Sequence, residues 1–277
     1  MKVGTGPTRV SPTRGTIRNR QKGCAMRVTR VEVEGPTTSF RYPHFLVGRQ
    51  PTYEMPPLAT LYGHICSAVG EWLDPSGLRI GFRFTYTAKA DDKEQIHIIT
   101  ASAPRAKLPG TDMPANVETG APQSIQIREY LFEPRLTLYV APAEWTEAFR
   151  QPRYTVILGR SQDLMTYTRV SEVELVEAAD AYYEHTLLPW ALRPHVLRCR
   201  TELLPRFVDY ANRRQPHFAR YLVVKERIFT NEGEHWLRYA DRGPKAHWVD
   251  PESPEVCGLR RGVWLHSLLE SDDGDLP

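Results

Sequence analysis

The sequence predicts an α+β fold, because segments with strand-like and helix-like hydrophobic spacing alternate along most of the chain. Val31 and Val33 alternate with charged residues, which is the pattern of a half-buried strand that ends at Gly35-Pro36. Apolar residues then recur at helical spacing from Leu58 to about Leu73, after a favoured helix start at Pro56-Pro57. A chain of 277 residues with 41% hydrophobic content can fill a core of its own.

The elements after this helix are expected to be mainly strands. Strict alternation predicts a strand over Ile80–Tyr86, with Ile96–Ile99 as its hairpin partner across the polar turn Asp91–Lys93. The elements expected next are strands near Ile125 and over Leu136–Val140, a short helix over Ala143–Phe149, and strands over Tyr154–Leu158 and around Val173. Strand, helix, two strands, helix, strand is the order of ferredoxin-like domains, a plan shared by RRM-type RNA binders.

Composition divides the chain into four parts. We expect a disordered basic tail over 1–25, a ferredoxin-like domain over 26–179, a smaller β-rich part over 180–269 and an acidic tail over 270–277. Within the first domain, the Ala-, Pro-, Gly- and Thr-rich residues after 100 predict an extended excursion over about 100–127.

The charge distribution restricts how the chain can bind an anionic partner. The net charge is +3, but residues 1–25 hold six basic side chains and no acidic ones, so the remainder is close to −3. Phosphate binding therefore needs a local groove, since the body of the protein is not basic.

Several classes of protein are excluded by the sequence. No run approaches the roughly 18 apolar residues of a membrane span, and the N-terminus lacks the apolar segment of a secretory signal, so we expect a cytoplasmic protein. The cysteines lie singly, without CxxC pairs or histidines at ligand spacing. We therefore expect no metal site and no cofactor. The cysteines are Cys24, Cys66, Cys199 and Cys257.

Three segments together resemble one family. They are GPTTSFRYPHFLVGRQPTYEMPPLATLYGHICSAVG over Gly35–Gly70, YTVILGRSQDL over Tyr154–Leu164 and the closing strand over Gly262–Ser267. This combination resembles the CRISPR-associated Cas-five family, and its first segment is most similar to type I-B members. Members are Cascade subunits that cap the 5′ handle of the guide RNA (crRNA) in antiviral defence. The likeness runs from about Met26 to Ser267.

The resemblance implies a non-catalytic scaffold in a ribonucleoprotein. Its partners would be the 5′ handle of the crRNA, the large subunit and the first backbone subunit of Cascade, and, through the complex, target DNA. The excursion over about 100–127 matches the family's thumb, a β-hairpin that projects over the guide.

The residues of the first segment suit RNA. Arg41 and Arg49 lie in the acid-free stretch Gly35–Tyr53, so no neighbouring carboxylate in the sequence cancels their charge. Aromatic rings in the same stretch can stack on unpaired bases. These rings belong to Tyr42, His44, Phe45 and Tyr53. Further candidate RNA contacts are Arg105 and Lys107 in the excursion, and Arg160 and Ser161 after a strand.

Two alternatives remain open at this level. One branch of the same family, which serves type I-C systems, cuts precursor crRNA without a metal, and Tyr42, His44 and Arg49 are the residues available for such acid-base chemistry. A stand-alone RRM-type protein would instead stack RNA on a central strand, for which Phe82 and Phe84, with Tyr86, are the candidates.

Overall fold

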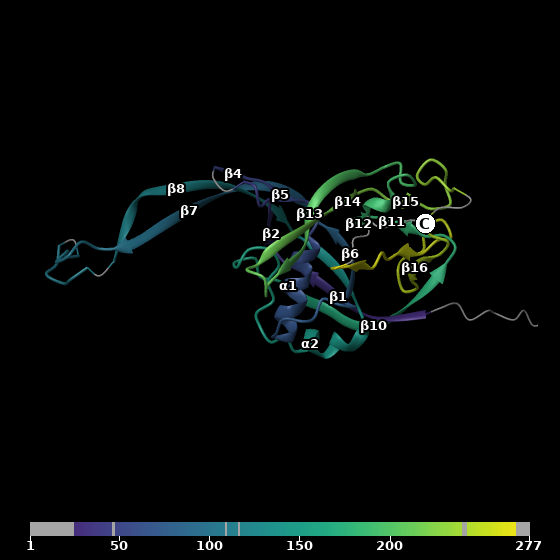
Figure 1. Cartoon of the computed structure of the whole chain (residues 1–277), viewed down its shortest axis with the longest axis horizontal. Coiled ribbons are helices and arrows are strands. Elements are labelled where there is room, and N and C mark those ends of the chain that lie inside the picture. Colours follow the sequence, from purple (N-terminus) through teal and green to yellow (C-terminus); the bar gives the residue numbers. More distant parts are fainter. Residues whose placement is uncertain (1–24, 46–47, 109, 116, 240–242, 270–277) are drawn as a thin grey trace, which may run out of the picture.

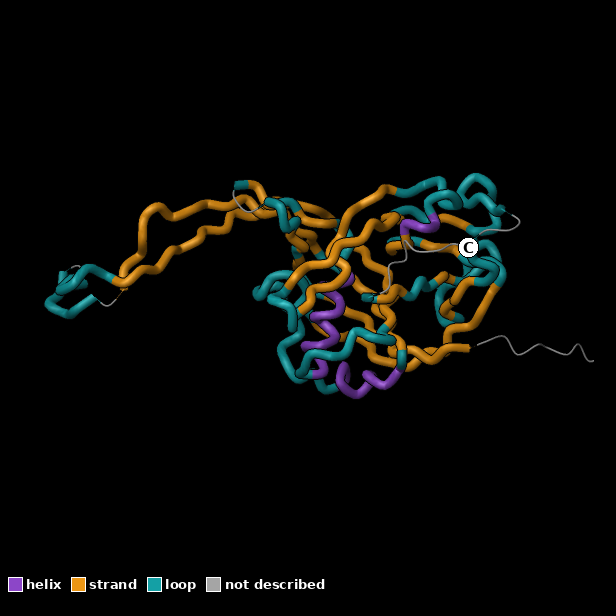
Figure 2. The backbone as a smooth tube through the Cα atoms, in the orientation of Figure 1, coloured by secondary structure: helices purple, strands orange, loops and turns teal. Residues whose placement is uncertain are grey.

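The chain folds mainly into β-structure. The computed structural model describes residues 25–45, 48–108, 110–115, 117–239 and 243–269, of which 47% lie in strands and 10% in helices (Figure 2). The predicted acidic tail and the predicted basic tail, apart from Ala25, lie outside the described residues. None of the helices in the described part of the chain is long and apolar enough to cross a membrane.

A nine-stranded sheet forms the framework. Its strands, in spatial order, are β15 (Ile228–Phe229), β11 (Tyr182–Tyr183), β17 (Arg261–Gly262), β16 (His247–Asp250), β10 (Thr166–Ala178), β1 (Ala25–Glu34), β9 (Arg135–Ala141), β6 (Arg79–Thr85) and β18 (His266–Ser267). The central strand β1 runs antiparallel to both neighbours, with Val31 opposite Val170 on one side and Leu138 on the other. Val28 and Val31 lie on opposite faces of this sheet, and both are fully buried because a separate core cluster covers each face.

The predicted α+β, ferredoxin-like domain with a separate β-rich part is therefore wrong. Strands from both ends of the chain enter one sheet, and the helical component is small: α1 spans Leu58–Val69, whereas α2 has only five residues, Thr146–Arg150. Local periodicity identifies strands but carries no information about their distant partners, so it could not show that β16 would pair with β10. The predicted boundary at residue 180 falls between β10 and β11.

A long hairpin projects from this body (Figure 1). It consists of β7 (Ala88–Ala101) and β8 (Val117–Phe132), paired from Ala88 opposite Phe132 outward to Ala101 opposite Val117. The predicted hairpin of Ile80–Tyr86 with Ile96–Ile99 is wrong, because β6 pairs with β9 and the supposed turn Asp91–Lys93 lies inside β7.

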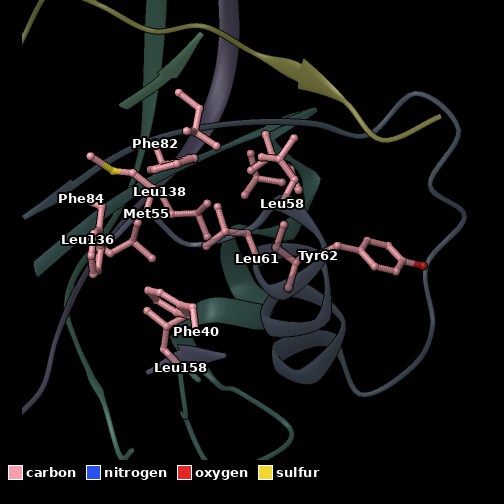
Figure 3. Packing of buried hydrophobic residues seen from close by; sticks show 14 of the residues in the cluster. Phe40, Met55, Leu58, Leu61, Tyr62, Phe82, Phe84, Leu136, Leu138 and Leu158 are labelled. Atoms are coloured by element: carbon pink, nitrogen blue, oxygen red, sulfur yellow. The ribbon is translucent and has the colours of Figure 1, made fainter. Parts of the chain in front are cut away.

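The core explains why β6 pairs with β9. Phe82 and Phe84 lie opposite Leu138 and Leu136, and all four pack against α1 and Phe40 (Figure 3). Burying each such side chain contributes roughly 1.5–3 kcal/mol. The predicted helix is confirmed by α1, which begins after Pro57 and ends where Gly70 turns left-handed at φ 99°.

The remaining elements complete the body. A three-stranded sheet, β12 (Thr186–Pro189), β14 (Gln215–Val224) and β13 (Arg200–Asp209), packs on α1 through Phe207 and Tyr62, whose ring centroids are 5.4 Å apart. The short elements are β2 (Thr37–Thr38), β3 (Phe40–Arg41), β4 (Arg49–Gln50), β5 (Thr52–Tyr53) and two 3₁₀ turns, Ala143–Trp145 and Trp190–Leu192.

Candidate nucleic-acid interface

The segment Gly35–Tyr53 is fixed to the base of the projecting hairpin. β2 pairs with β8 through Thr38 and Leu131, and β4 runs parallel to β8 with Arg49 opposite Ile127. Between them, β3 and β5 pair with each other, so the described residues of the segment, 35–45 and 48–53, form a folded loop. Figure 1 shows β4 and β5 where the hairpin leaves the body.

Four of the predicted RNA-binding residues lie on this loop, and an aromatic residue of β14 that was not predicted lies beside them. The rings of Tyr42 and Tyr53 are stacked, with centroids 3.7 Å apart, and Phe45 meets Tyr42 edge-on at 6.2 Å. His44 lies nearly parallel to Phe218 of β14, with a centroid distance of 6.1 Å. We call Tyr42, His44, Phe45, Tyr53 and Phe218 the aromatic platform.

One side of the aromatic platform is buried and anchored, and the other side is exposed to solvent. Tyr53 is buried and its hydroxyl donates to the Leu203 carbonyl at 3.0 Å, whereas His44 is exposed and Phe45 is 49% exposed. A flat ring that is held by its neighbours but open to solvent loses little conformational entropy when a base stacks on it. The platform can therefore accept unpaired bases.

The two arginines of the loop differ sharply. Arg41 is exposed on β3 and makes no ion pair with a described residue. Arg49 instead pairs with Asp91 of β7 at 2.8 Å and with Glu129 of β8 at 2.9 Å, and these hydrogen bonds hold its pKa above the ordinary value. Of the two loop arginines, Arg41 is therefore the one whose charge no described carboxylate neutralises, while Arg49 joins the loop to the hairpin.

A network of charged groups lies beside Tyr42. Glu54 is ion-paired with Lys225, Arg200 and Lys89, and Arg200 also pairs with Glu202. Burial raises the pKa of Tyr42, and the adjacent Glu202 carboxylate raises it further. The phenol of Tyr42 is thus neutral near pH 7, so that its ring can stack and its hydroxyl can donate a hydrogen bond.

Arg160 is also held by carboxylates. Its guanidinium donates to Asp163 at 2.9 Å and to Glu94 and Asp92 of β7 at 2.8 and 3.2 Å. Although burial opposes the charge, these bonds to Asp163 and Glu94 hold the pKa of Arg160 above its ordinary value. This cluster fastens residues 159–163 to the hairpin, with Ser161 exposed beside it.

Gly159 fits this junction for a steric reason. Its φ of 101° is left-handed, and a Cβ there would come within 2.7 Å of the Ser39 carbonyl oxygen. Only glycine lets the residues before Arg160 approach β2 so closely.

Arg105 and Lys107 belong to the segment that joins the end of β7 to the start of β8, and Figure 1 shows this end of the hairpin far from the body. Both are exposed, Arg105 with a left-handed φ of 67°, and Lys107 is paired with Asp112 at 2.6 Å. The structure therefore separates the predicted residues into a platform at the base of the hairpin, a charged junction at Arg160 and a distant tip.

Phe218 belongs to the aromatic platform but was not predicted from the sequence. It belongs to β14, far along the chain from the loop, and no motif links the two segments. Only the folding of β14 beside the loop places its ring near His44. Within the described residues, no group of three or more His, Cys, Asp or Glu side chains is arranged to hold a metal ion.

Comparisons with known proteins give partial likenesses only. No protein-family model matches the chain, and no curated protein matches its sequence. A chain of a CRISPR RNA-guided surveillance complex is similar over 73% of this chain and 89% of its own length, with 16% identity and a TM-score of 0.45. A CRISPR protein from Archaeoglobus fulgidus is similar over 87% of this chain and 100% of its own, with 13% identity and a TM-score of 0.44.

A further solved structure, described as a Cas protein, covers 72% of this chain and 94% of its own length, with 12% identity and a TM-score of 0.34. These structural neighbours are CRISPR-associated proteins.

Proposed function

We propose that the chain is a non-catalytic RNA-binding subunit of a type I CRISPR surveillance complex, of the Cas-five kind, that holds the 5′ handle of the guide RNA. The observation that carries this proposal is the aromatic platform next to the exposed Arg41. Stacking faces beside an uncancelled positive charge are the two elements that single-stranded RNA requires. The resemblance of Gly35–Gly70 to the family supplies the identity of the RNA.

The same resemblance extends the proposal to partners and subtype. As a type I-B-like subunit, the chain would connect the large subunit with the first backbone subunit and reach target DNA only through the complex. The hairpin β7–β8, which projects from the body, would serve as the thumb over the guide (Figure 1).

A non-catalytic role is supported by the surroundings of Tyr42. A general base must lose its proton near neutral pH, and burial with Glu202 shifts the pKa of Tyr42 in the opposite direction. Arg49, another residue of the ribonuclease alternative, is occupied by two carboxylates. The stand-alone RRM alternative is disfavoured because Phe82 and Phe84 are buried in the core.

Binding of labelled repeat RNA to the purified chain tests the proposal. We expect RNA carrying the 5′ handle to bind more tightly than an RNA of equal length with a scrambled handle. Tyr42→Ala should reduce this binding, whereas Tyr154→Ala, at a residue that is 58% exposed outside the platform, should not. Equal affinity for both RNAs would contradict the proposed handle recognition.

The ribonuclease alternative is tested by incubating the same RNA with the chain in EDTA. We expect the RNA to remain intact. Site-specific cleavage that disappears in His44→Ala would overturn the non-catalytic proposal.

A further inference from the structure

A cavity lies on the opposite side of the body from the hairpin. It has a volume of about 450 Å³ and is bordered by the starts of β1 and β6, by β16 and by residues 263–265. Figure 1 shows β16 and the hairpin at opposite ends of the molecule, so this cavity is separate from the aromatic platform. Its size is within the range of small-ligand sites.

Two tryptophans give the cavity flat apolar walls. Trp248 packs against a core cluster that contains Val28 and Tyr139, and Trp264 packs against a second cluster that contains Tyr183 and Trp236. Both tryptophans are only half-buried. Each ring is thus held by a different part of the core and still borders the open space, which suits stacking of a planar ligand.

A buried imidazole adds a polar group to these walls. His247 is 4% exposed, and its Nδ1 is 3.0 Å from the Tyr183 hydroxyl. Its Nε2 makes no hydrogen bond to any residue in the described part of the chain. Burial, with a further contribution from Arg238, lowers the pKa of His247 to about 4, so the ring is neutral near pH 7. A neutral imidazole offers one donor and one acceptor, and Nε2 is left for a ligand.

Positive charge borders the same cavity. Arg79, the exposed first residue of β6, contributes to its lining. Lys245 is exposed between Pro244 and Ala246, which both line the cavity. Arginine and lysine are the side chains that bind phosphate, the former through a planar fork of donors.

We propose that this cavity binds a nucleotide, with the base against Trp248 and Trp264, the base edge at His247, and the phosphate at Lys245. Flat faces, an imidazole nitrogen with no hydrogen-bond partner among the described residues and an adjacent cation are the combination that a base linked to phosphate requires. A hydrocarbon ligand would leave the imidazole unsatisfied. The nucleotide is either free or part of bound RNA, and only the second case rests on the proposed function.

Titration of the full-length chain with AMP and UMP, followed by tryptophan fluorescence and calorimetry, tests this site. We expect quenching by both, with tighter binding of AMP because a purine has the larger stacking face. Ala246→Leu, which enlarges an exposed side chain of the cavity lining that is not part of the core, should weaken AMP binding at least about tenfold. Trp72→Phe, at an exposed tryptophan elsewhere, should leave it unchanged.

Competition distinguishes the two sources of nucleotide. If AMP displaces a single-stranded oligonucleotide from the wild type but not from Ala246→Leu, the site accepts a nucleotide of RNA. If AMP does not displace the oligonucleotide from the wild type, the site is specific for free nucleotides. Absence of quenching and heat with both nucleotides at millimolar concentrations, or equal AMP affinity in Ala246→Leu, would overturn the proposal. Handle-RNA binding through Tyr42 and Arg41 is measured independently, so failure here is distinguishable from failure of the proposed function.

Discussion

Tyr42 lies stacked on Tyr53, with their ring centroids 3.7 Å apart and their planes inclined by 27°. The two tyrosines of this pair have different roles, one as the anchor of the stack and one as its solvent-facing ring. Tyr53 is buried and anchored, while Tyr42 is half-buried and continues the stack toward solvent, where Phe45 and His44 lie. A base that stacks on this platform meets a surface that is already ordered.

Removing the upper ring should weaken RNA binding without unfolding the chain. Tyr42→Ala is expected to lower handle-RNA affinity about tenfold, since stacking on one aromatic ring contributes about 1–3 kcal/mol per base. Tyr42→Phe keeps the ring and should bind nearly as well as the wild type. Fluorescence anisotropy measures both, and an equal reduction in the Phe and Ala variants would assign the effect to the hydroxyl instead.

The lower ring should affect stability rather than binding. Tyr53→Phe removes the hydroxyl that donates to Leu203 but keeps the stack, and should lower the free energy of unfolding by about 1 kcal/mol. Urea unfolding measures this cost. Handle-RNA affinity should be unchanged. A large drop in affinity would show that Tyr53 acts in RNA binding and not only in stability.

The two loop arginines should respond differently to substitution. Arg41→Ala removes an exposed cation, so the slope of log affinity against log salt should become shallower by about 0.7 if Arg41 binds one phosphate. Arg49 is occupied by Asp91 and Glu129, so Arg49→Ala should leave the salt slope nearly unchanged. Anisotropy titrations over a series of salt concentrations measure both slopes. If Arg49→Ala changed the salt slope more than Arg41→Ala, the RNA phosphates would bind on the hairpin side of the loop.

The charged junction should matter for stability. Arg160→Ala leaves the fully buried carboxylate of Asp163 and that of Glu94 without this partner, and breaking a buried pair costs about 3–5 kcal/mol. Arg150→Ala, which breaks an exposed ion pair with Glu147, is the matched control and should cost under about 0.5 kcal/mol. Urea unfolding of both variants makes the comparison, and similar costs would contradict the structural role of Arg160.

Acid should destabilise the chain through His247. Because burial lowers its folded pKa to about 4, below the usual value of 6.5, the unfolded chain takes up a proton first as the pH falls. The free energy of unfolding should therefore decrease from about pH 6.5 toward pH 4, by roughly 3 kcal/mol from this residue. His247→Asn should remove that part of the pH dependence, whereas the exposed His217→Asn should not. An identical pH profile for wild type and His247→Asn would contradict the assignment.

Local features of the sequence predict some elements correctly and others not; the strand predicted over Tyr154–Leu158 is wrong, because only an isolated bridge at Ile157 forms there. The helix after Pro57 and the strand around Val31 are confirmed as α1 and β1, since both depend on spacing within a few residues. Pairing depends on the whole chain: Phe82 and Phe84 fit a hairpin with Ile96–Ile99 by pattern alone, but they pair with β9 because Leu136 and Leu138 complete their side of the core. The ferredoxin-like prediction is wrong for the same reason.

The sequence likewise predicts only part of the candidate site, because some of its contacts join residues that are far apart in the chain. The loop has no acidic residue in sequence, which makes Arg49 and Arg41 look equivalent, yet Asp91 and Glu129 lie 42 and 80 positions after Arg49 and neutralise it. Phe218 joins the platform from still farther along the chain. Composition within a window cannot include such partners, because folding brings them from other elements.

Photochemical crosslinking tests the central claim most directly. The chain is bound to repeat RNA that carries 4-thiouridine in its 5′ handle, irradiated and digested, and the crosslinked peptides are identified by mass spectrometry. We predict crosslinks at Tyr42, His44 or Phe45. Crosslinks confined to other surfaces, with none in the segment Gly35–Tyr53, would contradict the assignment of the aromatic platform as the handle-binding site.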